Sequence, residues 1–499
     1  MGDYSWAPPD CKVWAVSLSP MSPMLGSPLE KYDFALTIDG RSYGVREEFE
    51  VLNPASEEVV ASAPDADQPA VEAAMKAALR AAPAWAMTPV SQRASHVYDF
   101  ANEVAEHLED LSHLLVLEQG KPLASAKSEL FSSLDYLRRL ADIAESELEF
   151  SAANLPRGTK VIRKPLGVVA GITAWNYPVQ LACSKLAMAV LTGNATVLKP
   201  SPYTPLTTLA LGQLSRDAFP PGVVSVLSGL DPLGEWITAH PTISKIGFTG
   251  STRTGCAIAE SAAHRLTRLT LELGGNDAAI VLPDANIEAA AEGIIASALE
   301  NTGQLCNAVK RVIVHESIER DLTDAMVDVA NSLVIGDGMN ASTDLGPIQN
   351  RMQFERLKAL RESVAQEGGT FHCGEQTFSG PGYFMAPSII SGLSDASRLV
   401  SEEQFGPLVP ILGYDDVDQA MVRANSSPFG LGASVWTSDV DKGLALAEQF
   451  EAGSVWINHH SALSPDYPSG GHKLSGLGVE YGVHGLEEYT QHQVIRIAT

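Results

Sequence analysis

The chain has 499 residues, 45% hydrophobic and 19% charged, which is a composition typical of a globular protein. This length allows roughly three domain-sized units with large buried cores. With 60 acidic against 34 basic residues, the net charge of −26 argues against nucleic acid and anionic membrane surfaces as partners.

The sequence also bears on compartment and redox state. No apolar run approaches the roughly 20 residues that span a bilayer, so no membrane segment is expected. Asp3 and Asp10 lie where a secretory signal would be basic, so we expect a cytoplasmic protein. The five cysteines are too scattered for a disulfide framework, and the absence of a CxxC pair gives no reason to expect a metal. All but one are expected to be small buried hydrophobes: Cys11, Cys183, Cys256 and Cys373.

The N-terminal segment, residues 1–30, is rich in Pro and Ser and lacks hydrophobic periodicity. These features predict a flexible extension. Met21 and Met24 are alternative start sites within it.

Two helical segments follow the extension. "DQPAVEAAMKAALRAA" has helical apolar spacing, with Asp67 as a candidate N-cap and Pro69 just inside. A longer helix is predicted from Ser91 to Gly120, because its apolar residues recur on one face. We expect both helices to cover a sheet.

A parallel sheet is predicted from Pro165 onward. Short apolar runs alternate there with helical segments: "GVVAGITAW", "ATVLK", "VVSVL", "KIGFT" and "RLTLEL". This alternation is typical of a doubly wound α/β fold, in which ligands collect at the carboxyl ends of the strands. The residues at or just beyond those ends are Asn176, Lys199, Gly250, Ser251 and Glu272.

A second α/β block begins near Ala278, and Cys306 follows its first helix-like segment, so the sulfur belongs to a second lobe. "EEQFGP", "GSVWIN" and "PSGGHKLSG" look like loops that line a cleft. The last stretch, "EEYTQHQVIRIAT", alternates like an edge strand, and a terminal edge strand often pairs with another subunit.

These residues could carry nucleophilic chemistry. Cys306 would attack a carbonyl if backbone N–H groups, a helix end or a nearby cation lowered its thiol pKa. Asn176 could hold the resulting oxyanion, and Glu272 could activate water to release an acyl group. The alternatives are a turn residue for Asn176 and a solvated carboxylate for Glu272. "GFTGSTRTG" misses the GxGxxG spacing, but its N–H groups could cradle a pyrophosphate.

Seven motifs together resemble one family. "WNYP", "KPS", "FTGST", "LELGG", "NTGQLC", "EEQFGP" and "GGHKLSG" occur in the order and at the separations of the NAD(P)-dependent aldehyde dehydrogenase superfamily. The resemblance covers residues 30–495. The chain is similar to a bacterial branch of the superfamily that has "KPSPYTPLTTL" and "LELGGNDAAIVLPD" in the same places. Each motif is weak alone, but seven in register are specific.

The resemblance implies an architecture. The expected parts are a doubly wound, parallel-sheet dinucleotide-binding domain, an α/β catalytic domain and a small β oligomerisation segment. Their expected bounds are 31–143 with 165–274, then 275–480, and finally 144–164 with 481–499. Family members form homo-dimers or homo-tetramers, so we expect one of these.

The resemblance also implies a reaction, the oxidation of an aldehyde to its carboxylic acid without coenzyme A. Cys306 corresponds to the nucleophile that forms a thiohemiacetal, whose oxyanion is held by Asn176 and the Cys306 N–H. Glu272 corresponds to the base that directs water onto the thioester. Lys185 corresponds to a lysine that tunes the site electrostatically.

The implied cofactor is NAD. Lys199 would contact the adenosine ribose and Ser251 the pyrophosphate, while Glu403 and Phe405 would orient the nicotinamide end. The remaining implied cofactor contacts are Thr173, Trp175, Ser201, Gly229 and Gly250. Pro202 stands where many NAD-using members have a carboxylate that would repel a 2′-phosphate, so NADP is the alternative.

Two further departures from the family pattern are Asn276, where Lys is commoner, and Ser469, where Phe is usual. Neither removes a group that the mechanism needs. A semialdehyde dehydrogenase is one alternative, but it needs a cation for the distal carboxylate, and none is evident. His459 and His460 could meet a polar substrate, although exposed loop histidines are the simpler interpretation.

A second alternative is a non-catalytic binding protein with a redox-sensitive Cys306. The joint presence of Asn176, Glu272 and Cys306 argues against it, because a decayed enzyme has little physical reason to keep all three groups.

Overall fold

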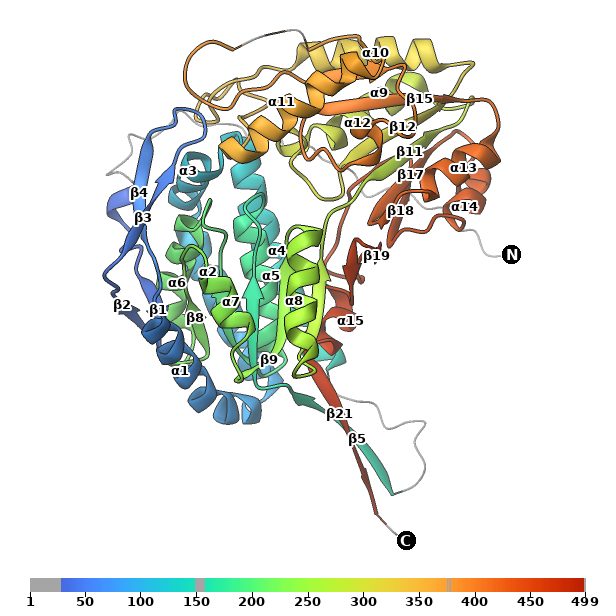
Figure 1. The fold of residues 1–499 in the computed structure, drawn as a ribbon. Helices are drawn as coiled ribbons and strands as arrows, with labels where there is room; N and C mark the ends of the chain where they lie inside the picture. The colour runs from blue at the N-terminus through green and yellow to red at the C-terminus, as the bar shows by residue number, and fades with distance from the viewer. Residues whose placement is uncertain (1–27, 149–157, 375, 377, 498–499) are drawn as a thin grey trace.

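A computed structural model describes residues 28–148, 158–374, 376 and 378–497 (Figure 1). The expected flexible extension, with its two alternative start sites and Cys11, therefore lies outside the described residues apart from a short 3-10 helix at Pro28–Glu30. Two large sheets form two lobes, and a two-stranded ribbon projects from the body (Figure 1).

The first lobe contains an eight-stranded sheet in the order β2-β1-β8-β7-β6-β9-β10-β20. Its five central strands are parallel and coincide with the five predicted apolar runs, so this prediction is confirmed: β8 (Val224–Val226), β7 (Ala195–Lys199), β6 (Val168–Ile172), β9 (Ile243–Thr249) and β10 (Arg268–Glu272). The antiparallel strands at the edges are β1 (Leu36–Ile38), β2 (Arg41–Tyr43) and β20 (Gly476–Leu477). The last of these comes from the range expected to belong to the catalytic domain.

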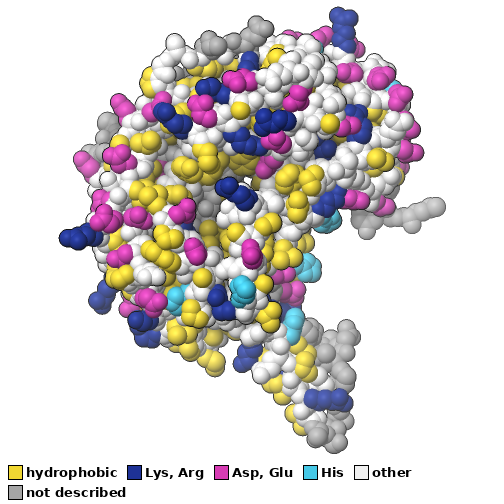
Figure 2. Space-filling view, in the orientation of Figure 1, with side chains coloured by type: hydrophobic (Ala, Val, Ile, Leu, Met, Phe, Trp, Pro, Cys, Tyr) yellow, Lys and Arg dark blue, Asp and Glu magenta, His cyan; other side chains and the backbone are white. Residues whose placement is uncertain are grey.

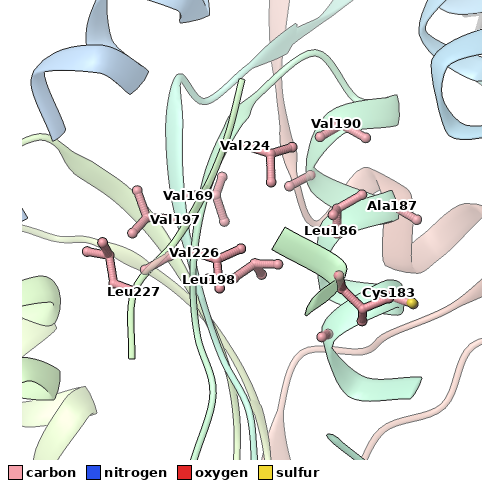
Figure 3. Close-up of a cluster of buried hydrophobic side chains, with 14 of the residues drawn as sticks. Val169, Cys183, Leu186, Ala187, Val190, Val197, Leu198, Val224, Val226 and Leu227 are labelled. Atoms are coloured by element: carbon pink, nitrogen blue, oxygen red, sulfur yellow. The ribbon is translucent and has the colours of Figure 1, made fainter. Parts of the chain in front are cut away.

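Helices cover both faces of this sheet (Figure 1). They are α1 (Gln68–Met87), α2 (Val90–Glu106), α3 (Leu108–Gln119), α4 (Leu123–Glu147), α5 (Pro178–Leu191), α6 (Leu206–Ala218), α7 (Leu233–Thr238) and α8 (Thr252–Ala263). Figure 3 shows part of the core, where Cys183 and Leu186 of α5 lie on the side of the sheet that bears Leu198 and Val226. The strands are buried on both faces, which explains their continuous apolar sequence.

The N-terminal helices agree only partly with the sequence prediction. Asp67 caps α1 as predicted, because its Oδ1 accepts a hydrogen bond from the Ala70 N–H at 2.9 Å. The predicted single helix from Ser91 to Gly120 is wrong, since His107 leaves helical geometry at φ −100° and ψ 10° and separates α2 from α3. Gly120 then ends α3 with φ 93°, a value that favours glycine.

Two helices of this lobe receive their N-terminal caps from elsewhere. The positions before α5 and α6 are Tyr177 and Pro205, which supply no side-chain cap. Glu129 of α4 accepts hydrogen bonds from the N–H groups at the start of α5, and Glu118 of α3 does the same for α6. Both glutamates are buried, and a carboxylate at a helix N-terminus is favoured by the helix dipole.

The second lobe contains a seven-stranded sheet in the order β13-β14-β15-β12-β11-β17-β18. Its strands are β11 (Asp277–Val281), β12 (Val309–His315), β13 (Thr370–Phe371), β14 (Ser388–Ser391), β15 (Leu408–Tyr414), β17 (Gly432–Trp436) and β18 (Ser454–Ile457). The interpretation of "GSVWIN" as a loop is wrong, because its residues form β18 in parallel pairing with β17. The helices are α9 (Ile287–Ala298), α10 (Glu319–Ser332), α11 (Arg351–Gln366), α12 (Arg398–Ser401), α13 (Val417–Asn425) and α14 (Val440–Ala447).

Three small two-stranded sheets complete the fold: β3 (Glu48–Leu52) with β4 (Val59–Pro64), β16 (Phe429–Gly430) with β19 (His472–Lys473), and β5 (Thr159–Pro165) with β21 (Thr490–Arg496). In the last pair β21 follows α15 (Gly482–Glu487), and the two strands form the ribbon that projects from the body (Figure 1). The predicted C-terminal strand is thus confirmed. Its pairing with another subunit, and the expected domain bounds, remain predictions.

The surface bears acidic side chains spread over the face shown in Figure 2 rather than gathered in one patch. Among the described helices, none is long and apolar enough to cross a membrane. Cys183 and Cys373 are buried as predicted, but the prediction was wrong for Cys256, which lies exposed on α8.

Glu118 makes the stability of the protein depend on pH. Burial raises the pKa of its carboxyl from 4.5 to about 7, although hydrogen bonds from Thr207 and Leu206 oppose this. The folded state therefore binds the proton more tightly, and the associated stability, up to about 3 kcal/mol, is present below pH 4.5 and lost as the pH rises through about 7.

We expect Glu118→Gln to flatten this dependence, because glutamine stays neutral and its Oε1 still accepts from the α6 N–H groups. The measurement is the thermal unfolding midpoint of both proteins across this pH window. Parallel curves for the two proteins would contradict this assignment.

Candidate active site

One large cavity of about 710 Å³ lies between the carboxyl ends of strands of the first sheet and segments that precede strands of the second sheet. Its lining includes most of the residues that the sequence singled out: Trp175, Asn176, Gly250, Ser251, Glu272, Cys306, Glu403 and Phe405. Strand ends of the first lobe and loops of the second lobe thus meet at one pocket. The other predicted site residues do not line it: Thr173, Lys185, Lys199, Ser201 and Gly229.

The loop that bears Cys306 has a strained, well-anchored backbone. Asn301 and Thr302 adopt left-handed φ values of 48° and 58°, which are unfavourable for residues other than glycine. The Thr302 hydroxyl donates to the Gly346 carbonyl at 2.9 Å, and the Asn301 side-chain amide donates to the Asn176 carbonyl at 3.1 Å. These bonds fix the loop against the end of β6, where Asn176 lies.

Asn176 is buried, and its side chain donates a hydrogen bond from the first lobe to the second. Its Nδ2 donates to the Gln304 carbonyl at 3.0 Å, while the Gln304 amide donates to the Asn301 carbonyl at 2.9 Å. An asparagine amide has two N–H donors, so one remains for a ligand in the pocket that Asn176 lines.

Cys306 is half-buried at the pocket wall. Burial raises the pKa of its thiol to about 12, and the Lys310 ammonium is the principal opposing charge. Lys310 Nζ donates to the carbonyls of Cys306 and Leu305 at 2.5 and 3.0 Å. The sequence pattern allowed for a lowered pKa through a nearby cation; that cation is present, but burial outweighs it. The thiol therefore needs a base to become a nucleophile.

Glu272 lies at the end of β10 and supplies a carboxylate to the same pocket. Its Oε1 has no hydrogen-bond partner among the described residues. Burial raises the pKa of Glu272 well above its ordinary value; the Glu480 carboxylate raises it further and Lys185 opposes both. A carboxylate with a raised pKa is a stronger base than an exposed one.

Glu480 is a pocket residue that sequence reasoning missed. Its carboxylate pairs with Lys185 Nζ at 2.5 Å, and both side chains are almost fully buried. Lys185 does not line the pocket, but both it and Glu480 act electrostatically on Glu272, in opposite directions. The sequence "GVEYG" offered only a lone glutamate among glycines, which is no signal of a role.

The residues expected at the nicotinamide end lie together. Glu403 Oε1 accepts from the Gly275 N–H at 2.9 Å and lies 3.7 Å from Lys310 Nζ. The rings of Phe405 and Trp175 meet edge to face with centroids 5.3 Å apart. A Cβ at Gly274 would lie 2.3 Å from Glu403 Oε2, so a larger residue there would displace the Glu403 carboxylate.

A phosphate could be held at the start of α8. Ser251 is the N-cap of this helix and accepts from the Thr254 N–H at 3.2 Å. Gly250 and Ser251 line the pocket, so the first N–H groups of α8 lie beside it. Thr249 and Thr173, at the ends of β9 and β6, have buried hydroxyl groups with no partner among the described residues. These groups fit a polar ligand such as a dinucleotide.

The predicted adenosine contacts form a second group at the ends of β7 and β8. Lys199 is buried there, and burial lowers the pKa of its ammonium to about 8 against the opposing effect of Asp231 and Asp65. Asp65 accepts from the Leu230 N–H at 2.9 Å, and a Cβ at Gly229 would lie 2.9 Å from its Oδ1. Lys199 and Gly229 thus lie near the same carboxylate.

Two histidines and two departures from the family pattern are also placed. His459 is exposed, whereas His460 is buried with Nδ1 2.8 Å from the Ser434 hydroxyl, so the exposed interpretation is wrong for His460. Neither histidine lines the pocket, but Ser469 does. Asn276 donates to the Val400 carbonyl at 2.9 Å.

Within the described ranges, no group of three or more metal-ligating side chains could hold a metal ion.

Comparison with known proteins identifies the family. The profile of the aldehyde dehydrogenase family matches residues 42–495. The chain is 39% identical to a probable aldehyde dehydrogenase from Pseudomonas sp, covering 93% of this chain and 94% of that one. It is 37% identical to human retinaldehyde dehydrogenase 3, covering 90% and 89%.

The fold gives the same result. An NAD+ complex of the Bacillus cereus aldehyde dehydrogenase matches with a TM-score of 0.92 and 34% identity, over 95% of this chain and 99% of that chain. The chain therefore belongs to the aldehyde dehydrogenase family and is an NAD(P)-dependent oxidoreductase that converts aldehydes to carboxylic acids.

Proposed function

We propose that the protein oxidises its aldehyde through a covalent thioester on Cys306, with Asn176 as oxyanion donor and Glu272 as general base. The observation that carries this proposal is the presence of a thiol, an amide donor and a partner-free carboxylate oxygen in one pocket. They are contributed by two different lobes, which makes a chance grouping improbable.

The first step forms a carbon–sulfur bond. Because burial raises the pKa of the Cys306 thiol, its proton is released to solvent in the pocket as sulfur attacks the aldehyde carbon, which leaves the Glu272 carboxylate free for the later hydrolysis. The carbonyl oxygen becomes the oxyanion of a thiohemiacetal. The Asn176 Nδ2–H and the Cys306 N–H would donate to it.

The second step removes a hydride from the thiohemiacetal carbon and leaves a thioester. The nicotinamide dinucleotide supplies the hydride acceptor when bound. The chain's contribution is to orient it: the Glu403 carboxylate, held by the Gly275 N–H, suits a ribose, and the Phe405 and Trp175 rings suit a planar nicotinamide.

The third step is hydrolysis of the thioester. The Glu272 carboxylate takes a proton from water, whose oxygen attacks the acyl carbon. Sulfur leaves as the carbon–sulfur bond breaks and is reprotonated, and the product is the carboxylic acid. The Lys185–Glu480 pair lies behind Glu272 and sets the pH at which it is ionised.

We infer NAD rather than NADP as the preferred cofactor. Pro202 removes one carboxylate from the expected ribose site, but Asp65 and Asp231 both act electrostatically on Lys199 in the same region. These negative charges would repel a 2′-phosphate. The two aspartates thereby take the place of the carboxylate that many NAD-using members have at the position of Pro202.

The substrate we propose is an aldehyde with an apolar or aromatic body. The pocket is lined by rings and aliphatic groups, among them Tyr136, Tyr177, Trp456, Tyr481 and Leu463. Its described basic lining residues are Arg253, in the first turn of α8, and Arg356, which donates to the Gln404 carbonyl beside Glu403. Both thus belong to the cofactor side. A distal carboxylate would lack a cationic partner, which disfavours the semialdehyde alternative.

We further propose that the protein is a cytoplasmic homo-dimer or homo-tetramer whose ribbon of β5 and β21 contributes to the subunit interface. Val494, Ile495 and Ile497 on this ribbon are exposed, at 65%, 44% and 67%. Apolar residues gathered on a projecting ribbon favour burial against a second copy.

The test is reduced-nicotinamide formation over aliphatic, aromatic and carboxylated aldehydes, with NAD and NADP in parallel. We expect turnover with NAD, the lowest kcat/KM for carboxylated aldehydes, and a loss in Cys306→Ala of more than about 10³-fold with cofactor binding retained. Activity retained in Cys306→Ala would contradict the thioester route. Cofactor binding without turnover of any aldehyde would favour the non-catalytic alternative.

The pH profile tests the role of Glu480. Since Glu272 acts as a base, kcat should rise with pH as its carboxyl ionises. Glu480→Gln removes a like charge and leaves Lys185 to favour the Glu272 carboxylate, so the pKa of Glu272 falls and the profile should move to lower pH. Glu487→Gln, on α15 outside the pocket lining, where the glutamate pairs with Arg163, serves as the control. An unmoved profile in Glu480→Gln would refute the coupling.

A further inference from the structure

Two charged side chains are buried behind the pocket wall, outside the pocket lining. Lys121, in the turn before α4, and Glu129, in α4, have exposed side-chain fractions of 1% and 0%. Their Nζ and Oε2 atoms lie 2.5 Å apart. A buried ion pair rarely stabilises a fold more than an apolar pair of the same size would, so stability alone does not explain this one.

Lys121 has further partners, and these lie at the pocket wall. Its Nζ donates to the backbone carbonyl of Asn176 at 2.9 Å and lies 3.7 Å from the centroid of the Tyr177 ring. The same Asn176 carbonyl accepts the Asn301 amide at 3.1 Å. This carbonyl is therefore held by one donor from each lobe.

Glu129 acts on the other side of the same turn. Its Oε1 accepts from the N–H groups of Val179 and Gln180 at 2.9 and 3.2 Å, in the first turn of α5. Tyr177, at the N-cap position, supplies no side-chain cap of its own. The carbonyl of Asn176 and the start of the following helix are therefore both bound to one Lys121–Glu129 pair.

We propose that Lys121 and Glu129 are positioning residues that fix the Asn176 backbone, so that its side-chain amide points at the oxyanion. The side-chain amide is directed by the backbone that carries it, and among the described residues its anchor is the Gln304 carbonyl. A donor that is already in place when charge develops costs no reorganisation during the reaction. This inference rests on the proposed function, which assigns the oxyanion to Asn176.

The variant that isolates this role is Lys121→Met/Glu129→Gln. It leaves no unpaired buried charge, and the Oε1 of the introduced glutamine can still accept from the α5 N–H groups. The hold on the Asn176 carbonyl is lost, together with the contact between the Lys121 ammonium and the Tyr177 ring. Displacing a catalytic group by about 1 Å can cost roughly 100-fold, so we expect kcat to fall by about 10- to 100-fold while KM for the aldehyde changes little.

Glu118→Gln is the matched control. Glu118 is equally buried and caps α6 as Glu129 caps α5, but its bonds lead to Leu206 and Thr207 rather than to Asn176. We expect its kcat to stay within about threefold of the parent value, the size of effect that a remote change in packing produces. An equal fall in kcat in both variants would mean that a loss of helix capping, not positioning, is responsible.

A double-mutant cycle with Asn176→Ala separates the inference from the proposed function. Asn176→Ala should lower kcat by about 10²- to 10³-fold, and adding Lys121→Met/Glu129→Gln should then cost little more. If Asn176→Ala lowers kcat but the two effects multiply, or if Lys121→Met/Glu129→Gln keeps full kcat, the positioning role is overturned. If Asn176→Ala itself has no effect, the oxyanion assignment fails instead.

Single variants cover the case in which the double variant does not fold. Lys121→Met alone removes the donor to the Asn176 carbonyl and leaves Glu129 to cap α5. A folded Lys121→Met with parent kcat overturns the proposal, while a kcat loss that disappears in the Asn176→Ala background supports it. Folding is checked by the thermal unfolding midpoint.

Discussion

The site depends on one set of buried hydrogen bonds that crosses from one lobe to the other. Asn176 ends a strand of the first sheet and Cys306 follows a helix of the second, so no single element could place them together. The Asn176 amide donates to the Gln304 carbonyl, and the Asn176 carbonyl accepts the Asn301 amide. Each bond fixes a loop that would otherwise be free to move, and together they bring the oxyanion donor and the nucleophile to one wall.

Burial strengthens these bonds and also creates the chemistry of the site. Away from water, hydrogen bonds are stronger, but charged groups are less stable. The thiol of Cys306 and the carboxyl of Glu272 consequently have raised pKa values. The thiol therefore gives up its proton only as it attacks, and the Glu272 carboxylate is a stronger base than an exposed one. Lys310 and Lys185, the buried lysines behind them, limit the cost of forming the thiolate and the carboxylate.

The sequence predicted what depends on local pattern. The five parallel strands of the first sheet follow from continuous apolar runs, and the placement of Asn176 and Glu272 follows from the rule that parallel strands end at one rim. The break at His107 was not visible, since the apolar spacing runs across it. The strand at Ser454–Ile457 was also missed, because its few residues lie between glycines and a polar loop.

Contacts between distant segments could not be read from the sequence. Glu480, Lys121 and Glu129 carry no motif. Each contacts a residue that lies far from it in the sequence, and no pattern in the intervening chain signals the contact. The sign of the Cys306 pKa shift was hidden for the same reason, since it is a balance between burial and charges from several elements. Family resemblance supplied residue roles, but only the structure supplies the groups that position and tune them.

The account's central claim is that Cys306 carries the acyl group and that Glu272 removes it. The most direct measurement is a rapid-quench experiment with Glu272→Gln, following reduced nicotinamide and the intact protein mass together. The account predicts a burst of one reduced nicotinamide per subunit, slow turnover afterwards, and a protein heavier by the acyl group at Cys306. Linear product formation with an unmodified protein mass would contradict it.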